Sequence, residues 1–322
     1  QWTNGVMKMY DHDMKLLKEK VYRGTNEKFN LAWNNWEKRK PIIIEPYVQS
    51  KKMNAFYSRL ERSSYGGQLE FNSYINHLKT YEHTSHNEDI VRHETGHGIL
   101  DVLRPEFMEQ DRFQTHAMHE SFGDLTCIFY QLSKPECIKQ LLNETQGNLN
   151  MTSFITLIGE PLNINAPNGE IRDVNNDKIM GQTSCDGHDL SNVLSAIMYE
   201  LIICYYDDLK QSLKEYSKEK ALYVAQRSVR ILFIRSLIEV PHPDPSFSAL
   251  GSQMFRIVVS KGYSFPVHFS DQVRKAFTKR NIDITKPHRK YDEICPVPRG
   301  NQSNQSRKHP FCGTFEDSDD DE

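Results

Sequence analysis

The sequence has no long apolar run, no excess of one charge and no internal repeat. It contains 40 lysine and arginine residues against 43 aspartate and glutamate residues, which gives a formal net charge of −3, and its mean hydropathy is −0.66. A membrane-spanning helix needs about 20 consecutive apolar residues, so we predict no span. The charge balance also provides no basic footprint for nucleic acid, so polyanions are excluded as expected partners.

Signals for targeting and for cysteine-based metal sites are also missing. The chain begins with Gln1 rather than Met and shows no charged-then-apolar leader, which predicts a fragment or a processed form and leaves the compartment open. The six cysteines have no C-x-x-C spacing, which excludes a zinc ribbon and a thioredoxin-type motif. The disulfide pairing and the oligomeric state stay open on the sequence alone.

The segment HETGH, residues 93–97, is the first feature that points to chemistry. Residues four apart in an α-helix lie on one face, about 6 Å apart at Cβ, so His93 and His97 can offer two imidazole nitrogens to one zinc ion. Glu94 follows His93 by about 100° of helical rotation and can reach a zinc-activated water without ligating the metal. We therefore predict a zinc site with Glu94 as the general base.

Two histidines do not complete a catalytic zinc site, which usually takes three protein ligands and keeps a fourth position for water. No third histidine follows His97 within about six residues, as it would in the metzincin arrangement. The next helical segment carries Glu120 and, one turn later, Asp124 on the same face. Glu120 is therefore the expected third ligand. Asp124 is expected behind the metal, where it would accept the N–H of a ligating imidazole.

The two motifs, HETGH at 93–97 and ESFGD at 120–124, together resemble those of the thermolysin-like gluzincin metallopeptidases, which combine H-E-x-x-H with a downstream E-x-x-x-D helix. The longer phrases HETGHGILDVLRPEF and HAMHESFGDL resemble poorly characterised thermolysin-like proteins more closely than secreted thermolysin. An H-E-x-x-H pattern alone arises by chance in many helices, whereas the second motif and a later histidine helix add context.

The resemblance implies further site residues outside the metal motifs. The segment CDGHDLSNVLSAIMYEL resembles the family's second active-site helix, in which a histidine near the start donates a hydrogen bond to the oxyanion, and here that residue is His188. Asp186 or Asp189 would then orient its imidazole. The segment MNAFYSRLERS resembles the family's edge strand, which implies that Asn54 and Ala55 form hydrogen bonds with an extended peptide substrate.

The predicted fold class is α+β, of the thermolysin-like type. We expect a small N-terminal α/β lobe over residues 1–105 that ends in the HETGH helix, and a mainly helical C-terminal lobe over 106–285 with the third zinc ligand. Residues 286–322 lose periodicity and are expected to form an unstructured tail. The cleft is expected at the seam between the two lobes. The expected elements are helices within 4–38, strands at 41–48, 53–57 and 68–74, and helices near 190–215, 218–239, 247–262 and 269–281.

The residues and the resemblance together predict a zinc metallopeptidase with one zinc ion per chain and a peptide or protein substrate. Zinc would lower the pKa of a bound water and polarise the scissile carbonyl, while Glu94 takes the proton of the water and returns it to the leaving amine. The alternative is a zinc-binding scaffold or interaction protein of the same fold that does not cut. A blocked cleft or a missing base would indicate the alternative, and Glu94 is present.

Overall fold

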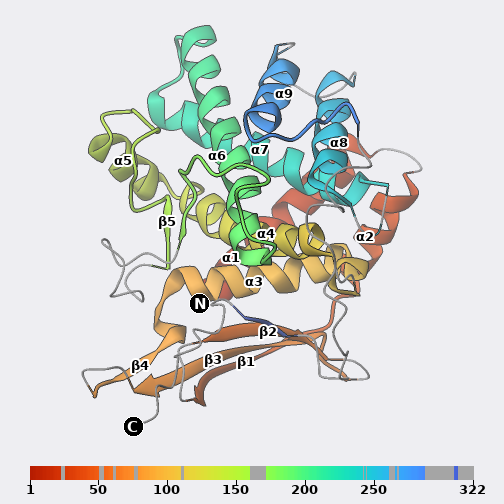
Figure 1. Cartoon of the computed structure of the whole chain (residues 1–322), viewed down its shortest axis with the longest axis vertical. Helices are drawn as coiled ribbons and strands as arrows, with labels where there is room; N and C mark the ends of the chain where they lie inside the picture. The colour runs from red at the N-terminus through yellow and green to blue at the C-terminus, as the bar shows by residue number, and fades with distance from the viewer. Residues whose placement is uncertain are drawn as a thin grey trace.

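A small sheet lies at one end of the molecule, and helices are stacked over one of its faces (Figure 1). This arrangement confirms the predicted mixed α+β class. The computed structural model describes residues 1–22, 26–50, 54–60, 63–75, 79–109, 112–159, 172–241, 243, 245–260, 265–266, 268–286 and 308–310.

The elements of the N-terminal part follow the predicted order of helices and then strands. Apolar residues at helical spacing bury one side of the first helix against the core, and β-branched and aromatic residues form the strands. The bounds are α1 (Trp2–Leu16), a π-helical turn η1 (Leu17–Val21), α2 (Glu27–Glu37), β1 (Ile42–Gln49), β2 (Ala55–Arg59), β3 (Gly67–Ile75) and β4 (Tyr81–His83).

The strands of the sheet are ordered β1-β3-β2-β7, and β4 pairs with β3 beside this path. Strand β1 runs parallel to β3, with Ile42 opposite Gly67, whereas β2 runs antiparallel to β3, with Tyr57 opposite Leu69. The final strand, β7 (Lys308–Pro310), pairs antiparallel with the other edge of β2. Strand β2 is therefore flanked on both sides.

The segment that we expected to be an unstructured tail thus contributes a strand to the sheet. Of residues 286–322, the described ones are 286 and 308–310, and the latter form β7, with Lys308 opposite Ser58 (dark blue in Figure 1). Pairing between segments so far apart in the chain has no local sequence signal, so periodicity could not predict it.

Helix α3 (Glu88–Leu103) lies over the sheet and carries the HETGH segment. Its N-cap is Asn87. The Asn87 side chain accepts hydrogen bonds from the backbone N–H groups of Asp89 at 2.9 Å and Ile90 at 3.1 Å, which have no partner within the first turn. The helix ends just before Pro105, which cannot continue it.

One carboxylate on α3 fixes strand β2 against this helix. Asp101, one helical turn after His97, accepts a hydrogen bond from the Tyr57 hydroxyl at 2.7 Å and from Arg59 Nε at 3.0 Å. Asp101 is buried, so both contacts are shielded from water. Strand β2 is thereby held at a fixed position beside the histidine helix.

Helix α4 (Phe113–Gln131) crosses α3 at a contact between two glycines. A Cβ atom on Gly96 would lie 3.0 Å from the Cα of Gly123, so the two backbones approach more closely than larger residues would allow. On its other side α4 packs against α6, where the hydroxyls of Ser121 and Ser195 share a buried hydrogen bond of 2.8 Å. The second metal motif is therefore brought directly over the first.

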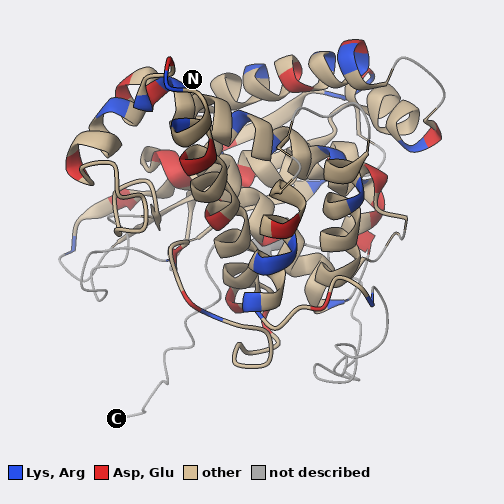
Figure 2. Ribbon diagram, turned by 90° about the horizontal axis from the view of Figure 1, so that it is seen from above, with Lys and Arg blue, Asp and Glu red and all other residues tan. Residues whose placement is uncertain are grey.

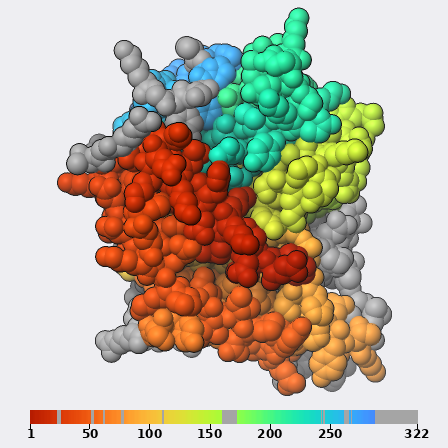
Figure 3. Space-filling view, turned by 180° about the vertical axis from the view of Figure 1, so that it is seen from behind, coloured from red at the N-terminus to blue at the C-terminus, as the bar shows by residue number. Residues whose placement is uncertain are grey.

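The remaining helices form the C-terminal part of the stack around α6, which is buried along most of its length. Seen from behind, the N-terminal helices (red) lie against both the sheet and this helical part (Figure 3). A buried ion pair between Asp13 and Arg230, 2.6 Å, joins α1 to α7. The bounds are η2 (Thr84–His86), η3 (Pro105–Glu109), α5 (Pro135–Glu144), β5 (Leu157–Ile158), β6 (Arg172–Asp173), α6 (Gly187–Ser212), α7 (Lys218–Glu239), α8 (Phe247–Val259) and α9 (Phe269–Lys279).

Charge and hydropathy on the structure agree with the composition. Basic residues (blue) and acidic residues (red) are interspersed along the helices (Figure 2). Within the described ranges, no helix combines the length and the apolar character that crossing a membrane requires.

The cysteines are distributed between free thiols and at least one disulfide. Cys127, Cys137 and Cys204 are free, whereas Cys185 is disulfide-bonded. The two remaining cysteines, Cys295 and Cys312, lie outside the described residues. Because Cys185 directly precedes the cap of α6, its cross-link restrains the start of the helix that carries His188.

Candidate metal centre and active site

Helix α3 supplies three potential metal-binding side chains from one face. His93, Glu94 and His97 are completely buried, and one ligand atom from each lies within 4.8 Å of the others. The four-residue spacing of the histidines places one imidazole above the other, and their ring centroids are 4.6 Å apart. This buried group could hold a metal ion.

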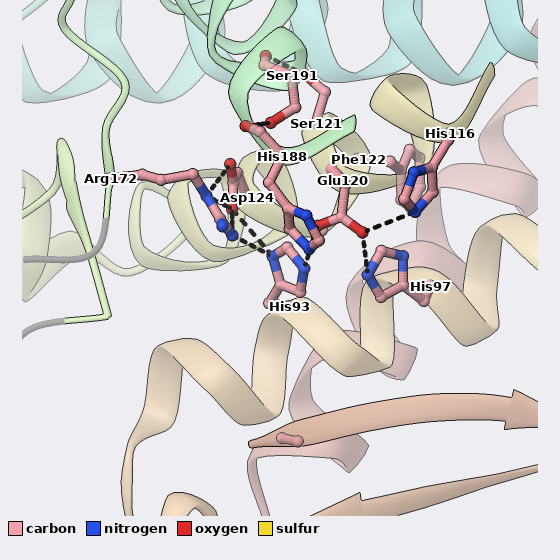
Figure 4. Close-up of polar contacts among 12 residues, drawn as sticks. His93, His97, His116, Glu120, Ser121, Phe122, Asp124, Arg172, His188 and Ser191 are labelled. Atoms are coloured by element: carbon pink, nitrogen blue, oxygen red, sulfur yellow. Dashed lines mark hydrogen bonds and ion pairs between the residues drawn. The ribbon is translucent and has the colours of Figure 1, made fainter. Parts of the chain in front are cut away.

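Helix α4 brings Glu120 to the same point. Its two carboxylate oxygens lie 3.3 Å from His93 Nε2 and 3.5 Å from His97 Nε2 (Figure 4). Ligand atoms on a tetrahedral zinc ion with bonds of about 2.0–2.1 Å are separated by about 3.3 Å. The spacing of these nitrogen and oxygen atoms therefore fits a single small cation held between α3 and α4.

The two buried glutamates differ in their electrostatic surroundings. Burial raises the pKa of Glu94 to about 8, whereas His188, His97 and His93 together overcome the effect of burial on Glu120 and hold its pKa well below the usual value. Among the described residues, neither carboxylate accepts a hydrogen bond of ordinary geometry. A cation would satisfy the anionic Glu120, and Glu94 is suited to carry a proton.

Asp124 lies behind His93, and its position links the histidine to a residue that the sequence did not indicate. Asp124 Oδ1 lies 2.9 Å from His93 Nδ1, and both its oxygens accept hydrogen bonds from Arg172, the shortest at 2.7 Å. The contact leaves Nε2 of His93 facing Glu120. Burial alone would lower the pKa of His93, but Asp124 and Glu120 outweigh it and raise this pKa to about 9.

His188 enters the site from the start of α6. Its Nε2 lies 3.5 Å from Glu120, and its Nδ1 lies 3.2 Å from Asp186, which also caps the helix by accepting the backbone N–H of His188. The hydrogen bond from His188 lowers the pKa of Asp186 to about 2. Of the two candidate partners, Asp186 therefore contacts the imidazole, while Asp189 is engaged by Lys178 at 2.7 Å.

Two more histidines lie on α4 close to these residues. His116 Nε2 lies 3.6 Å from Glu120, one helical turn away, and its side chain remains 31% exposed. His119 is completely buried and its ring stands 5.6 Å from that of His97. Both lie near the metal-binding group, but of the two only His116 is partly exposed to solvent.

The predicted substrate contacts, Asn54 and Ala55, lie at the start of β2. The Asn54 side chain accepts the backbone N–H of Ala55 at 2.9 Å, and the Asn54 carbonyl accepts hydrogen bonds from Asn72 N–H and the Thr84 hydroxyl, both at 3.0 Å. The neighbouring edge positions, 56–58, pair with β7. The stretch of β2 directly after the predicted contacts is therefore occupied by the chain itself.

The chain has no match among protein-family models and none among curated protein sequences. The sequence did not indicate Arg172, and it assigned no role to His116, although both lie at the site. Arg172 lies 48 residues beyond Asp124 and had no local signal, because its contact depends on how β6 returns to α4. His116 could have been recognised, since it precedes Glu120 by four residues and so shares its helical face.

Proposed function

We propose that this chain is a zinc-dependent peptidase of the thermolysin-like type. The observation that supports the proposal is that the carboxylate oxygens of Glu120 lie 3.3 Å from His93 Nε2 and 3.5 Å from His97 Nε2. The buried carboxylate of Glu94 lies beside the two histidines. Three protein ligands with a neighbouring proton carrier are what metal-assisted hydrolysis requires. When bound, zinc would supply Lewis acidity at the scissile carbonyl.

Each of the other side chains would have a distinct task. Glu94, with its raised pKa, would accept the proton of the attacking water and donate it to the leaving amine. His188, oriented by Asp186, would donate a hydrogen bond to the carbonyl oxygen as negative charge develops there. Asp124 would keep the Nε2 of His93 directed at the metal.

The alternative is a zinc-binding scaffold of the same fold that does not cut peptides. One observation favours it, namely that β7 pairs with the β2 edge on which an extended substrate would lie. The two proposals differ in what Glu94 does. In a peptidase its carboxylate is essential for turnover, whereas in a scaffold it only borders a metal ion.

The test compares the zinc-loaded full-length chain with its Glu94→Gln variant on a peptide library, with mass spectrometry as the readout and a chelator-treated sample as control. We expect the variant to keep its zinc and to lose hydrolysis by about 10²- to 10⁴-fold, because an amide cannot accept the proton of the water. Glu144→Gln makes the same chemical change at an exposed position and should leave hydrolysis unchanged.

The outcomes separate the two functions. Cleavage by the unchanged chain that disappears in Glu94→Gln supports the peptidase. Full zinc binding without cleavage of any library peptide identifies the scaffold. Undiminished turnover in Glu94→Gln would remove Glu94 as the base.

A further inference from the structure

Four imidazoles surround the single carboxylate of Glu120. His97 and His116 approach Oε1 at 3.5 and 3.6 Å, while His93 and His188 approach Oε2 at 3.3 and 3.5 Å. A catalytic zinc site needs three protein ligands, and His93, His97 and Glu120 already provide them. Two histidines are therefore available for another task.

The exposure of the side chains distinguishes the two proposed ligands, His93 and His97, from the other two histidines, His116 and His188. The side chains of His93 and His97 are completely buried, whereas that of His188 is 14% exposed and that of His116 is 31% exposed. A substrate can approach the site only where its side chains reach the surface. His116 and His188, which lie on opposite sides of Glu120 in Figure 4, are therefore the histidines that a peptide entering the site would meet first.

The fold holds His116 and His188 together although they come from different helices. Their rings meet edge to face with centroids 5.8 Å apart. This contact requires glycine at the start of α6, because a Cβ atom on Gly187 would lie 2.2 Å from His116 Nδ1. Gly187 thus allows the first turn of α6 to approach the His116 ring directly.

The ring orientation indicates which nitrogen His116 presents to the site. A neutral imidazole carries its proton on one of its two nitrogens, and the tautomer protonated at Nε2 offers an N–H donor on that side. Nε2 of His116 is the nitrogen that lies nearest to the carboxylate. In this form His116 directs an N–H group toward the centre of the site, and the Nε2 of His188 faces the same point from α6.

We propose that His116 is a second oxyanion-binding residue, which together with His188 holds the substrate carbonyl oxygen between two imidazole N–H groups. The proposal rests on the proposed peptidase function and names a residue that binds the reacting oxygen. Donors placed where charge develops act more strongly on the transition state than on the bound substrate. Loss of His116 should therefore slow turnover without a matching loss of substrate affinity.

The experiment uses the zinc-loaded full-length chain and its His116→Ala and His116→Gln variants. Zinc content, kcat and KM on a cleaved peptide are measured, together with the Kd of a peptide that carries a phosphonate in place of the scissile amide. We expect His116→Ala to keep one zinc ion per chain, to lose about a hundredfold in kcat with little change in KM, and to bind the phosphonate correspondingly more weakly. Glutamine offers an N–H group and should restore part of both losses.

His86→Ala removes an exposed imidazole elsewhere in the chain and serves as the matched control. Loss of zinc from His116→Ala would make His116 a metal ligand and overturn the proposal, as would an unchanged kcat with unchanged phosphonate affinity. If the unchanged chain cleaves no peptide, the peptidase function itself fails. If the unchanged chain cleaves and His116→Ala cleaves equally well, this inference alone fails.

Discussion

Asp124 connects the metal-binding group to the rest of the core. Its carboxylate lies within hydrogen-bonding distance of His93 Nδ1 and forms an ion pair with the guanidinium of Arg172. All three side chains are almost completely buried. Burial alone would raise the pKa of Asp124, but Arg172 and His93 keep it below the usual value. The carboxylate therefore stays ionised and fixes the orientation of the imidazole.

We expect Asp124→Asn to weaken zinc binding by about 10- to 100-fold, because an amide cannot neutralise the buried Arg172 and holds His93 less firmly. A competition titration with a chromophoric chelator measures the affinity. Asp177→Asn is the matched control, since the Asp177 side chain is 94% exposed. Equal zinc affinity in the Asp124 variant and the unchanged chain would contradict a supporting role for Asp124.

At the residue scale the sequence indicated which side chains share a helical face, but not which side chains from other elements contact them. Helical spacing alone places His93 beside His97 and Glu120 beside Asp124, because each pair lies on one helix. Spacing within a helix does not indicate which side chains of other elements will contact it. Arg172 comes from β6, and its contact with Asp124 depends on the path of the intervening chain.

At the scale of elements, the site depends on the close crossing of α3 and α4. A Cβ atom on Gly123 would lie 2.6 Å from His93 Nδ1, and Gly96 faces Gly123 across the same contact. Side chains at these positions would move the second motif away from the first. The spacing between the imidazoles and Glu120 is therefore a consequence of how two glycines pack.

Gly123→Ala should destabilise the chain by about 1–3 kcal/mol through overpacking, although alanine favours an isolated helix by about 1 kcal/mol over glycine. The displaced His93 should also bind zinc more weakly. Urea unfolding of the zinc-free protein measures the change in stability, and a zinc titration measures the change in affinity. Asn143→Ala on the exposed side of α5 controls for helix propensity. A Gly123→Ala chain that is at least as stable and binds zinc equally well would disprove this account of the crossing.

The order of the elements was predictable because hydrophobic periodicity is local. The long helices α6 and α7 and the strands β1 and β3 appear close to their predicted positions. The exact start of α3 could not be predicted, since both Asn87 and Asp89 are good N-cap residues and only the structure shows that Asn87 accepts the N–H groups. Strand β7 could not be predicted, because its pairing with β2 is entirely non-local.

At the scale of the whole molecule, the C-terminal segment and the proposed substrate compete for one edge. Strand β7 pairs with Phe56, Tyr57 and Ser58 of β2, the strand that Asp101 holds beside the histidine helix. An extended peptide that added to the sheet there would have to displace it. The tail is therefore expected to reduce peptide hydrolysis.

A chain that ends at Lys286 should fold and bind one zinc ion as the full chain does, and it should cleave peptides faster. Both chains carry Cys185→Ser, because Cys185 is disulfide-bonded in the full chain. Circular dichroism, zinc content and the rate of peptide hydrolysis are compared. Aggregation of the shortened chain would show that the tail completes the core, and slower hydrolysis would show that β7 supports the site.

The central claim is that His93, His97 and Glu120 hold one zinc ion between α3 and α4, and zinc analysis after exhaustive dialysis tests it most directly. We expect about one zinc ion per chain in the unchanged protein and almost none in His97→Ala or Glu120→Gln, because two remaining ligands hold zinc poorly. Far-UV circular dichroism confirms that the variants are folded. Full zinc retention by folded His97→Ala and Glu120→Gln chains would contradict the claim.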